Sequence, residues 1–435
     1  MRDIESVLIL GTGPASVQLA VLFRSGLGCR VGIAGRESVR SAPFFAALRE
    51  SGGTVRVTVR NEKHGRVAGE CAVDRVFRGY ENAAGDWDTV VLAVTTDAYL
   101  PVLKRLDRRI AGRAKRVVLL SPTFGSGFIV GAYLRELASE AEVISFSTYL
   151  GDTRWPDGKP SSRAVTAGVK KKVFAGSTHG RSGAMRTLGM LFERAGIALE
   201  DLDSPLEAES RNISLYVHPP LFMNDYALEA VFDGADATRY VYKLYPEGPV
   251  TMGVMRDMRA QWEEMTRLAE KLGLPGLNLL KFMTDDNYPV RPESLPRGDV
   301  EHFPHLAPIH QEYLLYVRYA SLLIDPFSEP DGEGRYADFS AVPIRPIYVN
   351  AEGEWEIPRM PKEDYYRIKM IQGIARMADS ACPTIDRFVA VYEGKLTETA
   401  RALRGERLSD AFAVRSFEED LRLVRSGLGR FVEDE

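Results

Sequence analysis

The sequence predicts an α/β fold, with an N-terminal doubly wound parallel sheet of the Rossmann type and a mostly helical C-terminal domain. Three observations carry this prediction. Apolar strand-like runs alternate with helix-like runs over the first 150 residues, glycines follow the first of these strands, and helical periodicity dominates beyond about residue 210. Uninterrupted apolar strands are typical of a parallel sheet covered on both faces. We therefore expect residues 1–210 to form a nucleotide-binding domain and residues 211–435 to form a substrate and dimerisation domain.

The alternation of strands and helices can be followed along the first 150 residues. The expected strands are 6–11, 30–36, 88–96, 116–123 and 141–148. The expected helices are 14–26, 41–51, 98–106 and 128–138, and the second of them has Pro43 in its first turn, where proline is tolerated. Each of the first four strands is thus followed by a helix, which is the order that builds a parallel sheet.

Beyond residue 150 the pattern changes twice. Residues 161–178 predict two strands with a turn at Lys170 to Lys172, and residues 182–196 predict a helix. From about residue 210 onwards, apolar residues recur with helical spacing over 258–273, 311–325, 365–378 and 408–427. A helical second domain is the expectation for this half.

Composition narrows the function classes. The 435 residues carry a net charge of −4, and the isoelectric point is about 6.0, which gives no reason to expect nucleic acid or an anionic membrane as a partner. The chain has three widely separated cysteines and no long uncharged apolar run, so we expect neither disulfides nor a membrane span. A strand begins almost at the first residue, which leaves no room for a signal peptide. We expect a cytoplasmic protein.

A glycine-rich turn is the most informative motif. Gly11-Thr12-Gly13-Pro14-Ala15-Ser16 lies between an apolar strand and an amphipathic helix, which is the context that a dinucleotide-binding turn requires. The first glycine allows the tight turn, and the second allows the pyrophosphate to approach the helix N-terminus. The small Ser16 at the third position keeps the helix close to the strand. The alternative is an ordinary strand–helix turn.

The end of the second strand bears on which dinucleotide is bound. NAD and FAD sites usually have an acidic residue there, about 20 residues after the turn, which accepts hydrogen bonds from the ribose. This chain instead has Arg36, Ser38, Arg40 and Ser41, with Glu37 as the one acid nearby. Arginine forms bidentate bonds with phosphate, so this set favours the 2′-phosphate of NADPH. A solvated basic loop is the alternative, and Glu37 could still hold a ribose.

Two further strand ends are candidates for the same cofactor site. Thr95 follows one buried strand and Ser121 follows the next. Because ligands of doubly wound sheets bind at the carboxyl ends of the strands, we expect both hydroxyls to line the cofactor site. Gly125 and Gly127 would allow a close backbone approach there. Each residue taken alone is equally compatible with ordinary turn chemistry.

Histidine suits a proton donor near neutral pH, and the chain has six. His302, His305 and His310 are separated by prolines and do not form a metal-binding face, so we expect no metal site. His218 lies in "NISLYVHPP", where the sheet domain gives way to helices, and the two prolines are expected to break that segment. His218 and Asn212 could face a cleft, or His218 could cap the break as a structural residue.

Several motifs in order resemble the opine metallophore dehydrogenases of the staphylopine and pseudopaline type. They are the Gly11-x-Gly13-Pro-Ala-Ser16 turn, the basic tip "GRESVRS", the run "SFSTYLGDTR" and the pattern N-x5-HPP. The similarity extends over most of the chain. It implies an NADPH-dependent enzyme that reductively condenses a histidine-aminobutyrate intermediate with a 2-oxo acid, pyruvate or 2-oxoglutarate, to make a metal-binding opine.

The resemblance also implies roles for individual residues. His218 would be the acid/base, Asn212 and Asp152 would lie near the substrate, and Arg36 would hold the 2′-phosphate. The second basic residue of the family's phosphate site, about six positions later, corresponds to Ala42, which leaves that contact open, with Arg40 as a replacement.

Five residues are candidates for binding the carboxylate of the oxo acid, and the sequence does not distinguish them: Tyr240, Tyr242, Lys243, Tyr288 and Arg291. We lean towards pyruvate, because Asp152 follows a strand near the carboxyl edge of the sheet and would repel a second carboxylate, unless a neighbour such as Arg154 cancels its charge. We also expect a homodimer that acts on small molecules. The alternatives are an FAD-dependent monooxygenase and a non-catalytic NADPH-binding protein.

Overall fold

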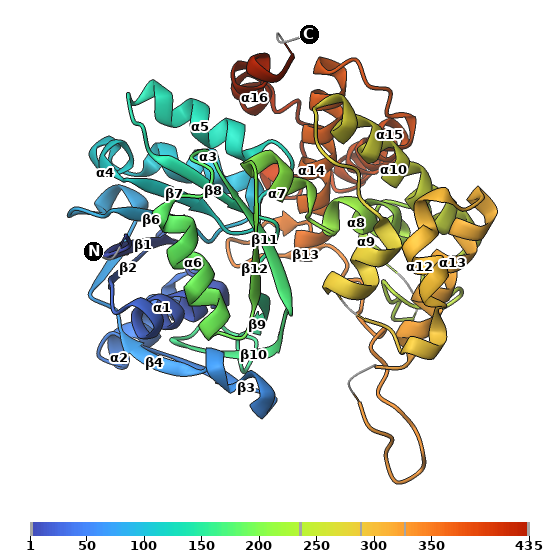
Figure 1. Ribbon diagram of the computed structural model, residues 1–435, viewed down its shortest axis with the longest axis horizontal. Coiled ribbons are helices and arrows are strands. Elements are labelled where there is room, and N and C mark those ends of the chain that lie inside the picture. Colours follow the sequence, from blue (N-terminus) through green and yellow to red (C-terminus); the bar gives the residue numbers. More distant parts are fainter. Residues whose placement is uncertain (1–2, 235–236, 288, 326–327, 433–435) are drawn as a thin grey trace. The chain divides into compact units, whose positions relative to one another are not determined.

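The computed structural model of the protein describes residues 3–234, 237–287, 289–325 and 328–432 (Figure 1). Its internal contacts divide the chain into two compact units. The first contains residues 1–212 and 419–433, and the second contains residues 213–418 and 434–435. The division falls close to the boundary expected at 210/211, and it also returns the last helix to the first unit.

A large mixed sheet is the centre of the first unit. Within the described residues it has eight strands in the order β12-β11-β8-β7-β6-β1-β2-β5, and every neighbouring pair is parallel except β8 and β11. The strand order changes direction at β1, which is the switch point of a doubly wound sheet. The predicted Rossmann-type sheet is therefore confirmed. The strands are β1 (Ser6–Leu10), β2 (Arg30–Gly35), β5 (Arg75–Arg78), β6 (Thr89–Leu92), β7 (Arg116–Leu119), β8 (Glu142–Phe146), β11 (Lys172–Ser177) and β12 (Ala198–Leu202).

A second, four-stranded sheet was not predicted. Its order is β4-β3-β10-β9, from β3 (Thr54–Val59), β4 (Gly69–Ala72), β9 (Gly151–Arg154) and β10 (Arg163–Val169). The two strands expected within 161–178 both form, but β10 joins this sheet and β11 joins the large one. Helix α1 (Pro14–Leu27) packs against strands of both sheets. Its buried Gln18 donates to the Val67 carbonyl at 2.8 Å and accepts from the Thr166 hydroxyl at 2.6 Å, which ties α1 to the small sheet.

Helices cover both faces of the large sheet, as Figure 1 shows. Helices α1 and α6 pack together on one face, and α3, α5 and α7 pack together on the other. Besides α1, the α-helices of residues 1–212 are α2 (Ala42–Glu50), α3 (Tyr99–Arg105), α4 (Arg108–Arg113), α5 (Ser126–Glu136), α6 (Gly183–Arg194) and α7 (Pro205–Ser210).

The last helix begins later than predicted. Helix α16 (Glu418–Val432) starts after Phe417, whose φ of 54° interrupts helical geometry, whereas the sequence predicted a helix over 408–427. Ser409 instead caps a short 3-10 turn over Asp410–Phe412. Gly427 of α16 lies against Phe128 of α5, so close that an added Cβ would be 2.7 Å from that ring.

The second unit is mostly helical, as predicted. Helices α10, α13 and α14 confirm the periodic segments of the sequence, whereas α15 was not predicted. The α-helices are α8 (Ser214–Phe222), α9 (Asp225–Phe232), α10 (Met252–Lys271), α11 (Leu279–Lys281), α12 (Arg297–His302), α13 (Pro308–Ala320), α14 (Arg359–Met377) and α15 (Pro383–Ala402), and a short ribbon pairs β13 (Tyr348–Val349) with β14 (Trp355–Glu356).

Helix α8 corrects one prediction. Pro219 and Pro220 lie inside this helix and do not break it after His218. Proline lacks the N–H that would bond the carbonyl four residues earlier, so Pro219 leaves the Leu215 carbonyl without its helical partner. The buried Gln261 side chain of α10 donates to that carbonyl instead. A side chain thus satisfies the acceptor that would otherwise make a proline costly here.

Candidate active site

The Gly11–Gly13 turn has the shape that a dinucleotide requires. Gly11 has a φ of 143°, and a Cβ added there would lie 2.4 Å from the Ala93 carbonyl oxygen of the segment after β6. A Cβ added to Gly13 would meet no described atom within 4 Å. Gly11 is therefore needed for the fold of the turn, whereas Gly13 leaves open space at the N-terminus of α1. That space and the helix N-terminus suit a pyrophosphate.

The rest of the turn agrees with this reading. Pro14 is the first residue of α1. The N-cap residue, Gly13, has no side chain that could accept a hydrogen bond from the first N–H groups of the helix. Thr12 and Ala15 are half-buried. Ser16 is fully buried, and its hydroxyl has no hydrogen-bond partner among the described residues. The residues present fit a bound anion at this turn.

The tip of β2 carries the cations that the sequence analysis singled out. Arg36 and Arg40 are both exposed, and across the described residues neither forms an ion pair with a carboxylate. Ser41 fixes the loop between them, because its hydroxyl donates to the Arg36 carbonyl at 2.5 Å and lies 3.2 Å from the Ser38 hydroxyl. Two uncommitted guanidinium groups on a braced loop suit a phosphate.

Thr95 and Ser121 lie at the same sheet edge as the glycine turn. They follow β6 and β7, and β6 pairs in parallel with β1, so the carboxyl ends of these strands lie together. Both residues are half-buried. The turn after β7 is held from within: the Thr123 N–H donates to the Thr96 and Ser126 hydroxyls, each at 3.0 Å. The structure therefore brings together the predicted residues of the cofactor site in this unit.

A buried carboxylate that the sequence analysis missed braces the same turn. Glu209 of α7 is fully buried and accepts from the Gly125 N–H at 2.8 Å, the Gly127 N–H at 2.7 Å and the Ser145 hydroxyl at 2.7 Å. The close approach that we assigned to Gly125 and Gly127 thus serves Glu209, because a Cβ on Gly127 would lie 3.0 Å from its carboxylate. Burial raises the pKa of Glu209 to about 8, against the opposing effect of these donors.

Asn212 is also committed to this turn. It is buried, and its side-chain amide donates to the Pro122 carbonyl at 2.9 Å. The contact described for it is thus to the backbone beside Ser121. A substrate contact for Asn212 stays a prediction.

In the second unit, His218 belongs to a buried polar network. Its Nδ1 lies 3.2 Å from a carboxylate oxygen of Asp364 on α14, and its side chain is 19 % exposed. The Phe222 ring meets the imidazole edge-on, with 5.4 Å between ring centroids. A carboxylate on Nδ1 fixes the ring and leaves Nε2 as the nitrogen for proton transfer. No motif points to Asp364, which is 146 residues from His218 in the chain.

Two arginines compensate the charge around this pair. Arg367 donates to Asp364 at 2.9 Å and to Glu363 at 3.0 Å, and all three side chains are buried. Burial raises the pKa of Glu363, but the charges of Arg367 and Arg359 outweigh it and hold the pKa at about 2. The second carboxylate oxygen of Asp364 has no hydrogen-bond partner among the described residues. Arg367 therefore anchors Asp364 through one oxygen, and the other oxygen could accept a further hydrogen bond.

Asp152 departs from its expected surroundings. It lies on β9 of the small sheet, which was not predicted. Arg154 grips its carboxylate with two contacts, of 2.8 and 2.5 Å. The expected repulsion of a second substrate carboxylate loses its basis, because residues two apart on a strand project to the same face and the guanidinium neutralises the charge. The preference for pyruvate is no longer supported by Asp152.

The five candidates for the oxo-acid carboxylate are not distinguished. Lys243 pairs with Glu247 at 2.7 Å and with Asp338 at 3.3 Å, so its charge is already neutralised by two carboxylates. Arg291 stacks on Tyr336, with 4.4 Å between its guanidinium carbon and the ring centroid. Tyr288 lies outside the described residues.

Lys170 differs from the solvated lysine that the sequence predicts at its turn. Burial lowers its pKa to about 8, and its amine donates to the Thr148 hydroxyl at 3.1 Å.

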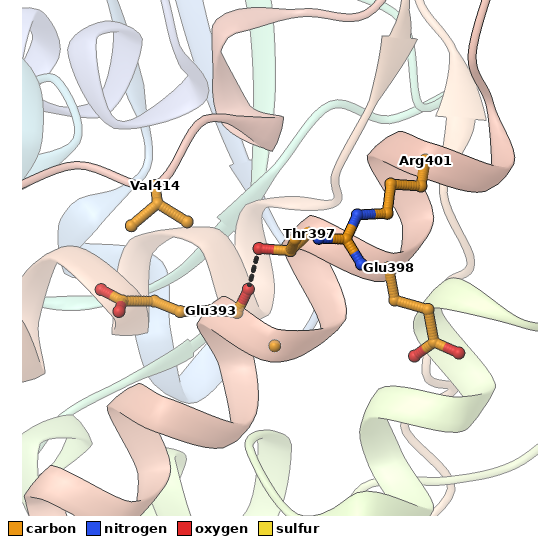
Figure 2. Close-up of a pocket in the computed structure, with 6 residues that line it drawn as sticks. Glu393, Thr397, Glu398, Arg401 and Val414 are labelled. Atoms are coloured by element: carbon orange, nitrogen blue, oxygen red, sulfur yellow. Dashed lines mark hydrogen bonds between the residues drawn. The ribbon is translucent and has the colours of Figure 1, made fainter.

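A hollow on α15 of the second unit is lined by none of the residues predicted for the site. Figure 2 shows Glu393, Thr397, Glu398 and Arg401 around it, with the Thr397 hydroxyl bonded to the Glu393 carbonyl at 2.8 Å. Glu393 already accepts from the Tyr365 hydroxyl and from Lys369. We assign no role to this hollow. In the described ranges, no helix is long and apolar enough to cross a bilayer, and no cluster of three potential metal ligands occurs.

A doubly wound sheet with an open glycine turn at its switch point is the arrangement of Rossmann-type dehydrogenases. Comparisons with known proteins are more specific. A model of the staphylopine dehydrogenase family matches residues 5–428. The chain is 45 % identical to staphylopine synthase of Staphylococcus aureus over 97 % of both chains, and 36 % identical to pseudopaline synthase of Pseudomonas aeruginosa over 91 % of both. The chain therefore belongs to the staphylopine dehydrogenase family.

Solved structures agree with this placement. The fold is similar to that of a yersinopine dehydrogenase with bound NADP+, with a TM-score of 0.91, 30 % identity, and coverage of 99 % of this chain and 100 % of the other. An octopine dehydrogenase crystallised with NADH and agmatine shares the fold at a TM-score of 0.64 and 15 % identity. The protein is an opine dehydrogenase, so the flavoprotein and non-catalytic alternatives are not retained.

Proposed function

We propose that the protein is an NADPH-dependent opine dehydrogenase that condenses the amine of a histidine-aminobutyrate intermediate with a 2-oxo acid and reduces the resulting imine, to make a metal-binding opine. The observation that carries the proposal is the cradle at the Gly11–Gly13 turn. There, one glycine is closed in by the Ala93 carbonyl and the other faces open space at a helix N-terminus. The family match supplies the type of reaction.

The choice of NADPH is supported by the second strand and by a relative. Arg36 and Arg40 replace the acidic residue that a ribose with a free 2′-hydroxyl would favour. The yersinopine dehydrogenase of similar fold holds NADP+. The dinucleotide supplies the hydride that reduces the imine carbon. Gly11, Gly13 and the N-terminus of α1 would hold its pyrophosphate, and Thr95 and Ser121 would line its path along the sheet edge.

The proposed acid/base is His218. Condensation of an amine with a 2-oxo acid releases water, so the departing hydroxyl must receive a proton. We assign this proton to Nε2 of His218. Asp364 holds Nδ1 of the same ring at 3.2 Å, which orients the imidazole. Arg367 donates to the same carboxylate oxygen and so helps to keep Asp364 in place.

Two further residues, Asp152 and Asn212, are proposed to lie near the substrate. The choice between pyruvate and 2-oxoglutarate stays open. The homodimer and the cytoplasmic location also remain predictions.

The test is steady-state turnover with NADPH, the amine substrate and either oxo acid. Replacing His218 with alanine is expected to lower kcat by roughly 10²–10⁴-fold, as for the loss of a general acid, while NADPH binding and the melting temperature are retained. Asp364→Asn should also lower kcat, because the ring loses its orienting carboxylate. A folded His218→Ala variant with near-normal kcat would move the chemistry elsewhere, and one that fails to fold would support a structural role for His218.

A further inference from the structure

Arg78 is a cation on β5, the strand at the edge of the large sheet. It is a candidate for the second phosphate contact, because this chain has Ala42 where the family has its second basic residue. Arg78 is the last residue of β5, the strand beside β2, and its register partner on β2 is Gly35. Arg36 follows Gly35 directly. Strands in parallel register end at the same edge of a sheet, so Arg36 and Arg78 leave neighbouring strands at the same level.

Contacts place the Arg78 side chain on the side of the glycine turn. Its guanidinium carbon lies 5.4 Å from the ring centroid of Phe45, a buried aromatic residue of α2. A Cβ added to Gly35 would lie 3.4 Å from the Phe45 ring and 2.2 Å from the Thr12 side chain. Arg78, Phe45 and Thr12 therefore surround the same glycine, and that glycine separates the pyrophosphate turn from the basic tip.

The backbone on both sides of the Arg78 side chain is fixed. The Gly79 N–H donates to the Gly35 carbonyl at 2.8 Å, and Gly79 has a φ of 90°, so the chain turns away immediately after Arg78. The Asn82 amide donates to the Arg78 carbonyl at 2.5 Å. Glu81, the acid nearest in sequence, is bonded to Arg105 at 3.0 Å. No ion pair occupies Arg78 across the described residues, so its in-plane N–H groups are available to a ligand.

We propose that Arg78 is the second cation that holds the 2′-phosphate of the dinucleotide, an inference that rests on the NADPH dependence proposed above. The phosphate would lie between Arg36 on β2 and Arg78 on β5. Both side chains are exposed, but Arg78 is better suited than Arg40, because stacking on Phe45 orients the Arg78 guanidinium before the ligand arrives. Preorganised donors lose less freedom on binding.

The experiment measures binding of two probes to the full-length protein by calorimetry: adenosine 2′,5′-bisphosphate and adenosine 5′-monophosphate, which lacks the 2′-phosphate. The variants are Arg78→Gln, Arg40→Gln and, as a matched control, Arg75→Gln. Arg75 begins the same strand, is also exposed, and pairs with Gly32 at the other end. Because 75 and 78 are three apart on a strand, their side chains project to opposite faces.

The wild-type protein should prefer the bisphosphate. Arg78→Gln should lower the affinity for the bisphosphate by about tenfold, the loss expected for one hydrogen bond between charged groups. Affinity for the monophosphate should hardly change, and Arg75→Gln should behave as wild type. An unchanged preference in Arg78→Gln, with or without a loss in Arg40→Gln, overturns the inference while leaving NADPH dependence intact. No preference in the wild-type protein overturns the NADPH proposal itself, and the inference with it.

Discussion

Replacing Glu209 with glutamine tests how the turn after β7 is held. Glutamine keeps the shape of the side chain but turns one acceptor oxygen into an NH2 donor. One oxygen of Glu209 accepts from Gly127 and Ser145 and the other accepts from Gly125, so either amide orientation sets a donor against a donor. One unsatisfied buried N–H costs about 1–3 kcal/mol. Glu209→Gln should lower the free energy of unfolding by that amount only if Glu209 is ionised, because a protonated Glu209 already places one O–H donor among the same groups.

The pH dependence gives a sharper result. A glutamate in the unfolded chain ionises near its ordinary pKa, whereas burial raises the pKa of Glu209 in the folded protein to about 8. Between these values the folded protein holds a proton that unfolding releases. The stability provided by this group is therefore fully present below the ordinary pKa and decreases as the pH rises towards 8. Between pH 6 and pH 8 the loss is about 2 kcal/mol.

The assay is urea unfolding of the wild-type protein and the Glu209→Gln variant at several pH values from 6 to 8. Glutamine does not titrate and resembles the protonated acid, so the two proteins should be similarly stable at pH 6, and the wild-type protein should be less stable than the variant by about 2 kcal/mol at pH 8. Glu207→Gln is the matched control on the same helix. The Glu207 carboxylate lies 3.9 Å from Arg211, farther than Glu209 lies from its donors. A variant that is less stable than the wild-type protein by about 1–3 kcal/mol at every pH would mean that the three donors keep Glu209 ionised, and the reasoning from burial would be refuted.

Two further predictions concern the glycine turn and the substrate. Gly13→Ala should keep the melting temperature and raise the KM for NADPH at least tenfold, because its Cβ meets only open space in the protein but would fill the place of the pyrophosphate. Gly11→Ala should instead lower the melting temperature, since its Cβ would meet the Ala93 carbonyl at 2.4 Å; equal behaviour of the two variants would contradict this division of roles. Asp152→Ala should leave the ratio of kcat/KM for pyruvate and 2-oxoglutarate nearly unchanged, because Arg154 already neutralises Asp152. A severalfold shift towards 2-oxoglutarate in that variant would restore the repulsion argument.

Local patterns made much of the first unit predictable. The β1 strand, the Gly11–Gly13 turn and α1 are consecutive in the chain, and each is set by residue types within a few positions, such as a glycine that tolerates positive φ. The apolar strands β6, β7 and β8 are readable because both of their faces are buried. The basic tip at Arg36 follows its strand directly. The cofactor side of the site was therefore accessible to sequence reasoning.

Misjudged segments had causes outside their own sequence. Helix α8 continues through Pro219 because Gln261, far along the chain, satisfies the carbonyl that proline leaves open. Asp152 was placed at the wrong sheet, since a strand's partners depend on residues distant in sequence. In the small sheet, β3 pairs with β10, about a hundred residues later in the chain. The hydrophobic periodicity of either strand does not predict which strand it pairs with.

The sequence by itself determined the fold class, the pyrophosphate turn, the cations at the tip of β2 and the candidacy of His218. Only the tertiary structure paired His218 with Asp364, brought Glu209 to the N-terminus of α5, and set Arg78 beside Gly35. The physical reason is that a turn or a helix is governed by neighbours within a few residues, whereas a buried carboxylate or a register partner is chosen by the packing of elements that lie 40 to 150 residues apart in the chain.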